Sequence, residues 1–207
     1  MKRLATIMIR PRETMREILD SPGRRWVIPL VLATMISAVA GDFDVAGFRH
    51  AMQQKQLVFL GPVIILVGSL VTIGLVYLFS WVASIIGRKV LEGTGNAADV
   101  RAAAAWGLVP AIWALLYRIP AIFLVRRETA DFGAGSFRIS RLMAEGCWAG
   151  LLMGTLELIT FVWVVVLTSN TVGEAHRFSS WRGFATLLMT WSVPLVVLIA
   201  GVLAVVS

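Results

Sequence analysis

One carboxylate stands out as a candidate for chemistry because the residues around it are apolar. Glu157 is the sole charged residue between positions 146 and 170. An ionised side chain in the middle of a membrane helix costs free energy, about 3 kcal/mol on insertion scales, so a polar partner has to compensate it. Glu157 could couple the movement of a proton or a substrate, or it could make a structural hydrogen bond between helices. The sequence leaves both interpretations open.

Depth in the membrane selects the partners that we expect for Glu157. If its segment enters the membrane from outside near residue 142, Glu157 lies 15 residues further, about 22 Å, and nearer the cytoplasmic side. Arg118 belongs near the outer end of its own segment, so we expect the two charges to stay apart. Hydroxyl groups at the matching depth belong to two other segments. They complete a predicted intramembrane polar cluster with Glu157: Tyr77, Ser80, Thr186 and Thr190.

Three glycines precede Glu157 at intervals of four residues: Gly146, Gly150 and Gly154. Glycine at this spacing lets another membrane helix approach closely. Glu157 follows Gly146 by eleven residues, about three helical turns, so its carboxylate should point along the same face. This glycine face could pack within the chain, or it could join two copies of the chain.

Motifs for catalysis or for metal binding are absent from the sequence. No His, Cys, Asp or Glu grouping has zinc spacing, and neither HExxH nor GxSxG occurs. Gly93-Thr94-Gly95 lacks the lysine of a nucleotide-binding loop and is interpreted as a tight turn between helices. Asn96 should cap the following helix, with Asp99 in its first turn. We therefore expect no enzymatic activity, no cofactor and no metal site.

The composition places the chain in a membrane. Of its 207 residues 58% are hydrophobic and 15% are charged, whereas soluble domains are roughly one quarter charged. Residues 57–87 and 183–207 contain no charged side chain, and each run exceeds the roughly 20 residues that span a bilayer. The net charge of +7 comes from basic residues at the ends of apolar segments, which favours lipid contact over nucleic-acid binding.

The apolar segments predict an all-α polytopic membrane protein. Residues 1–25 should form a short amphipathic cytoplasmic helix, and residues 26–207 a single domain of five transmembrane helices. Three prolines should kink the third and fifth helices: Pro110, Pro120 and Pro194. As an alternative, the third segment bends back as a re-entrant hairpin at Pro110 or Pro120. Residues 37–40 also resemble a signal-peptide cleavage site, but the acidic residues before them argue against cleavage.

Basic residues predict the orientation of the chain. The first 25 residues hold seven of the 19 Lys and Arg residues. With five crossings and a cytoplasmic N-terminus, cytoplasmic segments carry 12 basic residues and outer loops 7, in line with the positive-inside rule. We expect anionic lipids to attract five arginines to the membrane surface: Arg10, Arg12, Arg16, Arg24 and Arg25.

Three blocks of sequence resemble the Yip-domain (Ypt-interacting protein) family. They are IMIRPRETMREILDSP before the first segment, GTGNAADVRAAAAWGLVP at the start of the third, and WVVVLTSNTVGEAHRFSSWRGFATLL between the last two. The resemblance implies five membrane helices and a cytoplasmic N-terminus. Eukaryotic members are linked to vesicle trafficking and Rab-type GTPases. This compact chain is more similar to the bacterial branch, so the GTPase role is not carried over and the expected location is the bacterial inner membrane.

Two classes of function follow from these expectations. The favoured one is a non-enzymatic membrane adaptor or organiser that binds proteins or lipids through its N-terminal helix and cytoplasmic loops. The alternative is a small transporter or channel centred on Glu157 and the prolines. The expected partners are the lipid bilayer and either another membrane protein or a second copy through the glycine face. No nucleic-acid partner is expected.

Overall fold

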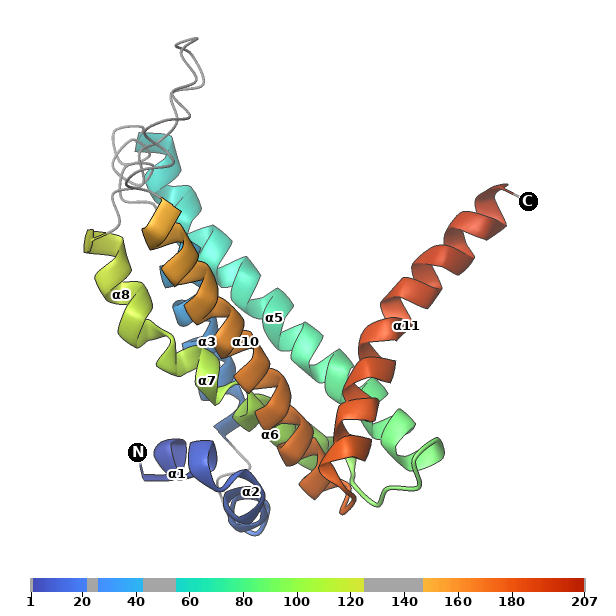
Figure 1. Cartoon of the computed structure of the whole chain (residues 1–207). Coiled ribbons are helices and arrows are strands. Elements are labelled where there is room, and N and C mark those ends of the chain that lie inside the picture. The colour runs from blue at the N-terminus through green and yellow to red at the C-terminus, as the bar shows by residue number, and fades with distance from the viewer. Residues whose placement is uncertain (1, 22–25, 43–54, 125–146, 207) are drawn as a thin grey trace.

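The computed structural model describes residues 2–21, 26–42, 55–124 and 147–206, and every regular element in these ranges is an α-helix. The prediction of an all-α protein is therefore confirmed. The helices are shown in Figure 1. Their bounds are α1 Lys2–Ile9, α2 Pro11–Leu19, α3 Val27–Asp42, α5 Lys55–Lys89, α6 Ala97–Gly107, α7 Val109–Trp113, α8 Leu115–Leu124, α10 Cys147–Ala175 and α11 Ser180–Val206.

Within the described residues, three stretches are long and apolar enough to cross a membrane: Leu66–Lys89, Ala97–Ala121 and Leu151–Ala175. They correspond to the second, third and fourth predicted segments. α3 contains a shorter apolar stretch, Val27–Ala40. The chain is thus an integral membrane protein with three candidate spans, rather than a clear set of five.

The third segment is divided into α6, α7 and α8, with breaks at Leu108 and Ala114. Pro110 lies in the first turn of α7 and has no backbone N–H to donate to the carbonyl of Trp106 one turn back, which accounts for the first break. Pro120 and Pro194 lie inside α8 and α11, which continue past them. The three pieces run on from one end of the bundle to the other without turning back (Figure 1), which favours a crossing over a hairpin.

The described part of the fourth helix is Cys147–Ala175, and it ends five residues later than the predicted position 170. Its last turns continue because protein surrounds them. Thr171 is fully buried, and its hydroxyl donates to the carbonyl of Ala103 in α6 at 2.9 Å. The loop to α11 is therefore confined to residues 176–179.

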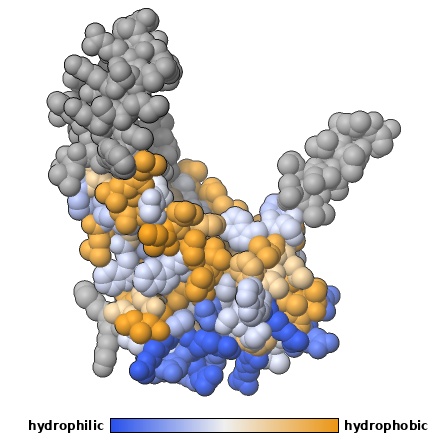
Figure 2. Space-filling model, viewed as in Figure 1, coloured by the Kyte–Doolittle hydropathy of each residue, from blue (hydrophilic) through white to orange (hydrophobic). Residues whose placement is uncertain are grey.

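Hydrophilic residues gather at one end of the molecule, below a largely hydrophobic body (Figure 2). We call this end the base. It comprises α1, α2, the turns at residues 90–96 and 176–179, and the ends of α6, α10 and α11 that adjoin these turns. Many large apolar side chains of α5 and α10 are exposed above the base. A lipid environment would cover these side chains without loss, so the division between base and body fits a protein set in a bilayer.

The tightest packing surrounds α6, just above the base. Residues 102–105 are four consecutive alanines, all buried, and α6 contacts α2, α3, α5 and α10. Alanine on every side lets neighbouring backbones approach, which accounts for the close packing of this helix. The N-terminal residues join the same core: Ile7 of α1 and Met15 and Ile18 of α2 are fully buried in it. Their apolar face thus packs on protein, where the sequence had predicted contact with lipid.

Candidate functional site

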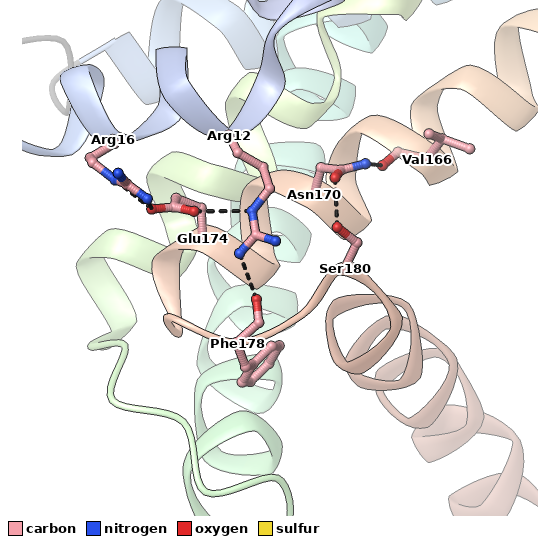
Figure 3. A network of polar contacts seen from close by, with 7 residues as sticks. All are labelled: Arg12, Arg16, Val166, Asn170, Glu174, Phe178 and Ser180. Carbon is pink, nitrogen blue, oxygen red and sulfur yellow. Dashed lines mark hydrogen bonds and ion pairs between the residues drawn. The ribbon is translucent and has the colours of Figure 1, made fainter.

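The N-terminal helix α2 is joined to the rest of the base through one carboxylate, Glu174, near the end of α10 (Figure 3). Arg12 donates through Nε to Glu174 Oε2 at 3.1 Å, and Arg16 donates through Nε to Oε1 at 2.9 Å. A second nitrogen of Arg12 donates to the carbonyl of Phe178 at 2.8 Å. Glu174 is only 7% exposed, so its charge is compensated mainly by these two arginines.

Two of the five arginines that we expected at anionic lipid, Arg12 and Arg16, bind an acid of the protein. Their side chains remain 41% and 71% exposed, so contact with lipid stays a prediction. Arg10, the residue before α2, is exposed and forms an i,i+3 pair with Glu13 at 3.5 Å. Arg24 and Arg25 lie outside the described residues.

A second pair of contacts joins α10 to the start of α11. Asn170 donates from Nδ2 to the carbonyl of Val166 at 2.8 Å, which fixes the direction of its side-chain amide. The hydroxyl of Ser180 then donates to Asn170 Oδ1 at 2.7 Å (Figure 3). The base therefore links α2, α10 and α11 through hydrogen bonds on both sides of the 176–179 turn.

His176 lies in a glycine-lined space between the two turns of the base. A Cβ atom built on Gly87 would lie 2.3 Å from the imidazole, and one on Gly93 or Gly95 would lie within 3 Å of its Nδ1. The ring stacks on Phe178 with 5.1 Å between centroids. The backbone amide of Thr94 donates to the carbonyl of His176 at 3.2 Å. Glycine is needed at these places because any larger residue would overlap the ring.

The contact with His176 explains why glycine occurs at positions 93 and 95, and this explanation differs from the predicted one. We expected the glycines to supply a tight turn, yet neither adopts a positive φ. The left-handed residue of this turn is Glu92, with φ 59°, and Arg177 in the other turn has the same value. The predicted cap is confirmed, since Asn96 Oδ1 accepts from the amide of Asp99 at 2.8 Å.

Burial favours the neutral form of His176. Its side chain is 1% exposed, and neither ring nitrogen has a hydrogen-bond partner among the described residues. Burial lowers the pKa of His176 below its ordinary value, and the nearby charge of Arg88 lowers it further. The backbone of Ala83 acts in the opposite direction with a smaller effect, although it does not meet the geometry of a hydrogen bond to either ring nitrogen. A neutral imidazole can pack against apolar glycine surfaces at little cost, whereas an imidazolium cannot.

An open polar pocket of about 450 Å³ lies beside this histidine. Its lining combines acidic and basic side chains from both turns and from the first turns of α6 and α11. It consists of Glu92, Thr94, Asp99, Ala175, His176, Arg177, Phe178 and Arg182. Both left-handed non-glycine residues noted above belong to this lining, so the backbone of each turn is shaped around the pocket.

Glu157 pairs with Arg118 in the body of the protein. The guanidinium donates through Nε to Oε1 at 2.8 Å and through Nη2 to Oε2 at 2.6 Å. Its remaining nitrogen donates to the carbonyl of Ser37 in α3 at 2.8 Å and to the Ser37 hydroxyl at 3.0 Å. Beside the pair, the hydroxyl groups of Tyr117 and Thr160 are 3.1 Å apart. One arginine thus connects α3, α8 and α10.

The prediction that Arg118 and Glu157 stay apart is wrong. The two side chains meet between α8 and α10 and share two hydrogen bonds. An arginine side chain is long enough to bridge a difference in depth between two helices, which an estimate from the ends of apolar segments does not take into account.

The predicted cluster does not assemble around Glu157, because its other members bond elsewhere. The hydroxyls of Ser80, Thr186 and Thr190 donate to carbonyls one turn back in their own helices, those of Val76, Arg182 and Thr186. Tyr77 lies beneath the guanidinium of Arg101, whose carbon is 3.8 Å from the ring centroid. All four lie on α5 or α11, away from the Arg118–Glu157 pair.

The glycines that bring helices together also differ from those predicted. Gly154 is exposed, and a Cβ built on it would meet no described atom within 4 Å. Gly146 and the surroundings of Gly150 lie outside the described residues. The close approaches are at Gly107, where a Cβ would lie 2.4 Å from Thr168 Oγ1, and at Gly183, where it would lie 2.0 Å from the carbonyl oxygen of Ser169.

Sequence reasoning missed Glu174 and His176 as parts of a site. Residues 171–182 were expected to form a short loop, in which neither residue was assigned a role. The sequence did contain a signal for Glu174. Glu174 follows an apolar span and was expected on the same side of the membrane as the N-terminal helix, where Arg12 and Arg16 are four residues apart and share one face. For His176 there was none, since its glycine neighbours lie more than 80 residues away in the chain.

Comparison with known families supports the resemblance read from the sequence. The Yip1 domain matches residues 5–202, which include the base, the pocket and the Arg118–Glu157 pair. No curated protein and no solved structure matched the chain. A match over nearly the whole length, on an all-helical structure with apolar spans, shows that this integral membrane protein belongs to the Yip1 domain family.

Proposed function

We propose that this chain is a non-enzymatic membrane adaptor whose base is the docking surface for another protein. The observation that carries the proposal is that hydrogen bonds join three separate parts of the chain into one polar surface. Glu174 joins α2 to the end of α10, and Thr94 joins the 90–96 turn to His176. A surface held in this way is preorganised, so that a partner need not order it on binding.

The pocket at the base is the proposed centre of this docking surface. It presents Arg177 and Arg182 together with Glu92 and Asp99, and it is open to the outside of the protein. Side chains of both charges favour a protein segment with alternating charges over a strongly acidic or basic one. The two left-handed residues support this role, because unusual backbone geometry concentrates at binding and catalytic sites.

The proposed topology has five crossings, with α3 and α11 added to the three candidate spans. α11 has 27 residues and α3 has 16, a length that crosses with help from a thinner bilayer or flanking polar residues. The base would face the cytoplasm, because it contains the basic N-terminal helices. We propose the bacterial inner membrane as the location, because the sequence resembles the bacterial members of the family more than the eukaryotic ones.

A transporter centred on Glu157 is the less favoured alternative. A carboxylate that couples proton movement has to lose and regain its proton, and both oxygens of Glu157 already accept hydrogen bonds from Arg118, which would have to break first. The pair is better explained as a structural connection between α8 and α10. In liposome flux assays we expect the wild type and Glu157→Gln to show the same background flux.

Affinity capture from native membranes in mild detergent tests the docking proposal. The bait is the full chain, compared with an Arg177→Glu, Arg182→Glu double variant that reverses the basic side of the pocket. Arg10→Glu serves as the matched control, because it reverses an exposed arginine of the base outside the pocket lining. We expect one near-stoichiometric partner with the wild type and the control, and its loss with the double variant. The same partner on all three baits, or none on the wild type, contradicts the proposal.

A further inference from the structure

Two arginines of the span Ala97–Ala121 have opposite surroundings. Arg118 is bound by Glu157 and Ser37. Arg101 forms no hydrogen bond and no ion pair with any described residue, and its Nε is enclosed without a partner. Its guanidinium lies on the face of Tyr77, with 3.8 Å from the guanidinium carbon to the ring centroid.

The ring of Tyr77 places this guanidinium inside the hydrocarbon core of the membrane. Tyr77 is eleven residues from Leu66 and twelve from Lys89, the two ends of its candidate span, which is about 17 Å from each. The hydrocarbon core is about 30 Å thick, so a charge held at this ring is far from the headgroups. An arginine at such a depth is costly unless an anion pairs with it, and an aromatic face offsets only part of that cost.

Next to this guanidinium, α5 presents an apolar face that no described helix covers. Leu70, Leu78 and Trp81 are more than half exposed, and their spacing puts them on one side of the helix. Gly74 lies among them and is exposed as well, and a Cβ built on it would meet no described atom within 4 Å. Tyr77 is at the edge of the same face and is 39% exposed. A glycine on such a face lets another membrane helix approach the backbone closely.

The described spans of a second copy of the chain do not supply the missing anion. Away from the base, the one acid of the three candidate spans is Glu157, and both of its oxygens accept hydrogen bonds from Arg118. A phospholipid phosphate stays at the membrane surface, outside the hydrocarbon core. The chemistry that fits this depth is a carboxylate on a membrane helix of another protein.

We propose that Arg101 and the α5 face around Gly74 bind a transmembrane helix of another protein that carries Asp or Glu near its middle. The terminal nitrogens of Arg101 donate to that carboxylate, a pairing that the fork of the guanidinium suits well. Gly74 is three residues from Tyr77, so the partner's backbone approaches α5 within one turn of the charge pair. The site lies inside the membrane and does not depend on docking at the base.

A model helix tests the site. The full chain, with a donor dye at its N-terminus, is placed in phosphatidylcholine bilayers with a synthetic Leu/Ala transmembrane peptide that carries an acceptor dye and one central Glu. We expect energy transfer to show binding about tenfold tighter than for the same peptide with Gln in that place, the usual scale of one charge-assisted contact. Moving the Glu two turns, about 11 Å, toward either end of the peptide should remove the preference.

Two variants separate the parts of the site. Arg101→Gln should bind the Glu peptide about tenfold more weakly than the wild type does. Gly74→Leu should weaken the binding of both peptides several-fold, and the open space around Gly74 lets this variant keep its fold. Arg10→Gln is the control for general loss of positive charge and should bind as the wild type does. No other protein is present in these bilayers, so the results are independent of any partner at the base.

Equal binding of the Glu and Gln peptides by the wild type would overturn the proposal, as would unchanged binding by Arg101→Gln or Gly74→Leu, or an equal loss with Arg10→Gln. Loss of peptide binding at a higher density of the chain would show that a second copy occupies the face. Loss on addition of phosphatidylglycerol would show that a lipid does, and either result contradicts the proposal. If Arg101→Gln fails to fold, as judged by size-exclusion chromatography, the two peptides on the wild type and on Gly74→Leu still decide the matter.

Discussion

The two halves of α10 are stabilised in different ways. From residue 151 to 166 none of its side chains is buried, whereas from 167 to 176 all are buried except Asn170. The half near the base packs against α2, α6 and α11 through small residues and closely approaching backbones. The far half is connected to α8 by Arg118 and by the Tyr117–Thr160 contact.

The difference shows where protein contacts are needed and where lipid replaces them. Exposed leucine, valine and phenylalanine side chains cover the outer surface of the far half, and lipid chains solvate such residues as well as a protein core does. At the base, by contrast, hydrogen bonds between segments hold the chain together, through Glu174, Asn170 and Thr171. The base is thus the part of the molecule with a fixed shape.

The largest effect should come from adding one methyl group at a close approach of the base. Gly183→Ala would place Cβ 2.0 Å from the carbonyl oxygen of Ser169, and a backbone atom cannot move aside easily. We expect a loss of about 3 kcal/mol in the free energy of unfolding, the upper part of the range for overpacking. Reversible unfolding in mixed micelles with increasing sodium dodecyl sulfate measures it.

Gly154→Ala is the matched control in the far half of the protein. No described atom lies within 4 Å of the added Cβ, and alanine favours helix over glycine by about 0.5–1 kcal/mol. We expect no loss and a small gain. Equal destabilisation by the two variants would show that the far half is packed as tightly as the base.

Breaking the ion pair should be the next largest effect, and it falls on the far half. Glu157→Gln leaves Arg118 without a counter-charge. We expect a loss of about 2 kcal/mol, less than the 3–5 kcal/mol of a fully buried pair because Glu157 is 43% exposed. An Arg118→Gln, Glu157→Gln double variant should recover part of that loss, since neither charge remains. A double variant that is as unstable as the sum of the singles argues against a coupled pair.

Neutralising Glu174 should have a smaller effect, confined to the base. Glu174→Gln removes the charge that holds Arg12 and Arg16, both of which remain partly exposed to water. We expect about 1–2 kcal/mol, decreasing at high salt as the wild-type pair is screened. Glu13→Gln is the control, because its exposed pair with Arg10 should be worth less than about 0.5 kcal/mol. A loss with Glu13→Gln that matches Glu174→Gln would contradict the special position of Glu174.

The smallest effect should be the pH dependence that His176 gives to the base. Its pKa is lowered in the folded protein, so the unfolded chain takes up a proton first as the pH falls. Stability contributed by neutral His176 is complete well above pH 6.5 and declines as the pH falls through about 6.5 toward the lowered folded pKa. Unfolding followed from pH 8 to pH 5 measures the decline, and His176→Gln should flatten it. An unchanged slope in that variant assigns the dependence to other groups.

Features set by local sequence were predictable. The charge-free runs predicted membrane helices, and the position of Asn96 predicted that it caps the helix that follows it. These features depend on residues within one or two turns of each other. The family resemblance added the arrangement as a whole, which the Yip1 domain match over residues 5–202 supports.

Features that depend on distant segments were not predictable in the same way. Matching Glu157 with its partner required the depth of residues on two helices, and the depths that we estimated from the ends of the apolar segments excluded Arg118. The glycines of the 93–95 turn were assigned a conformational role, because the sequence does not show that an imidazole from another loop fills the space beside them. The regular spacing of Gly146, Gly150 and Gly154 was the strongest local pattern, yet the described member of it, Gly154, is exposed.

Hydrogen–deuterium exchange of the full chain in lipid nanodiscs tests the central claim most directly, namely that Glu174 fixes the N-terminal helices to the base. We predict slow exchange in α2 and in residues 171–176 of the wild type. In Glu174→Ala, exchange in α2 should accelerate about tenfold or more while residues 151–166 stay unchanged. Rapid exchange of α2 in the wild type, or α2 protection that is the same with and without Glu174, would contradict a fixed base.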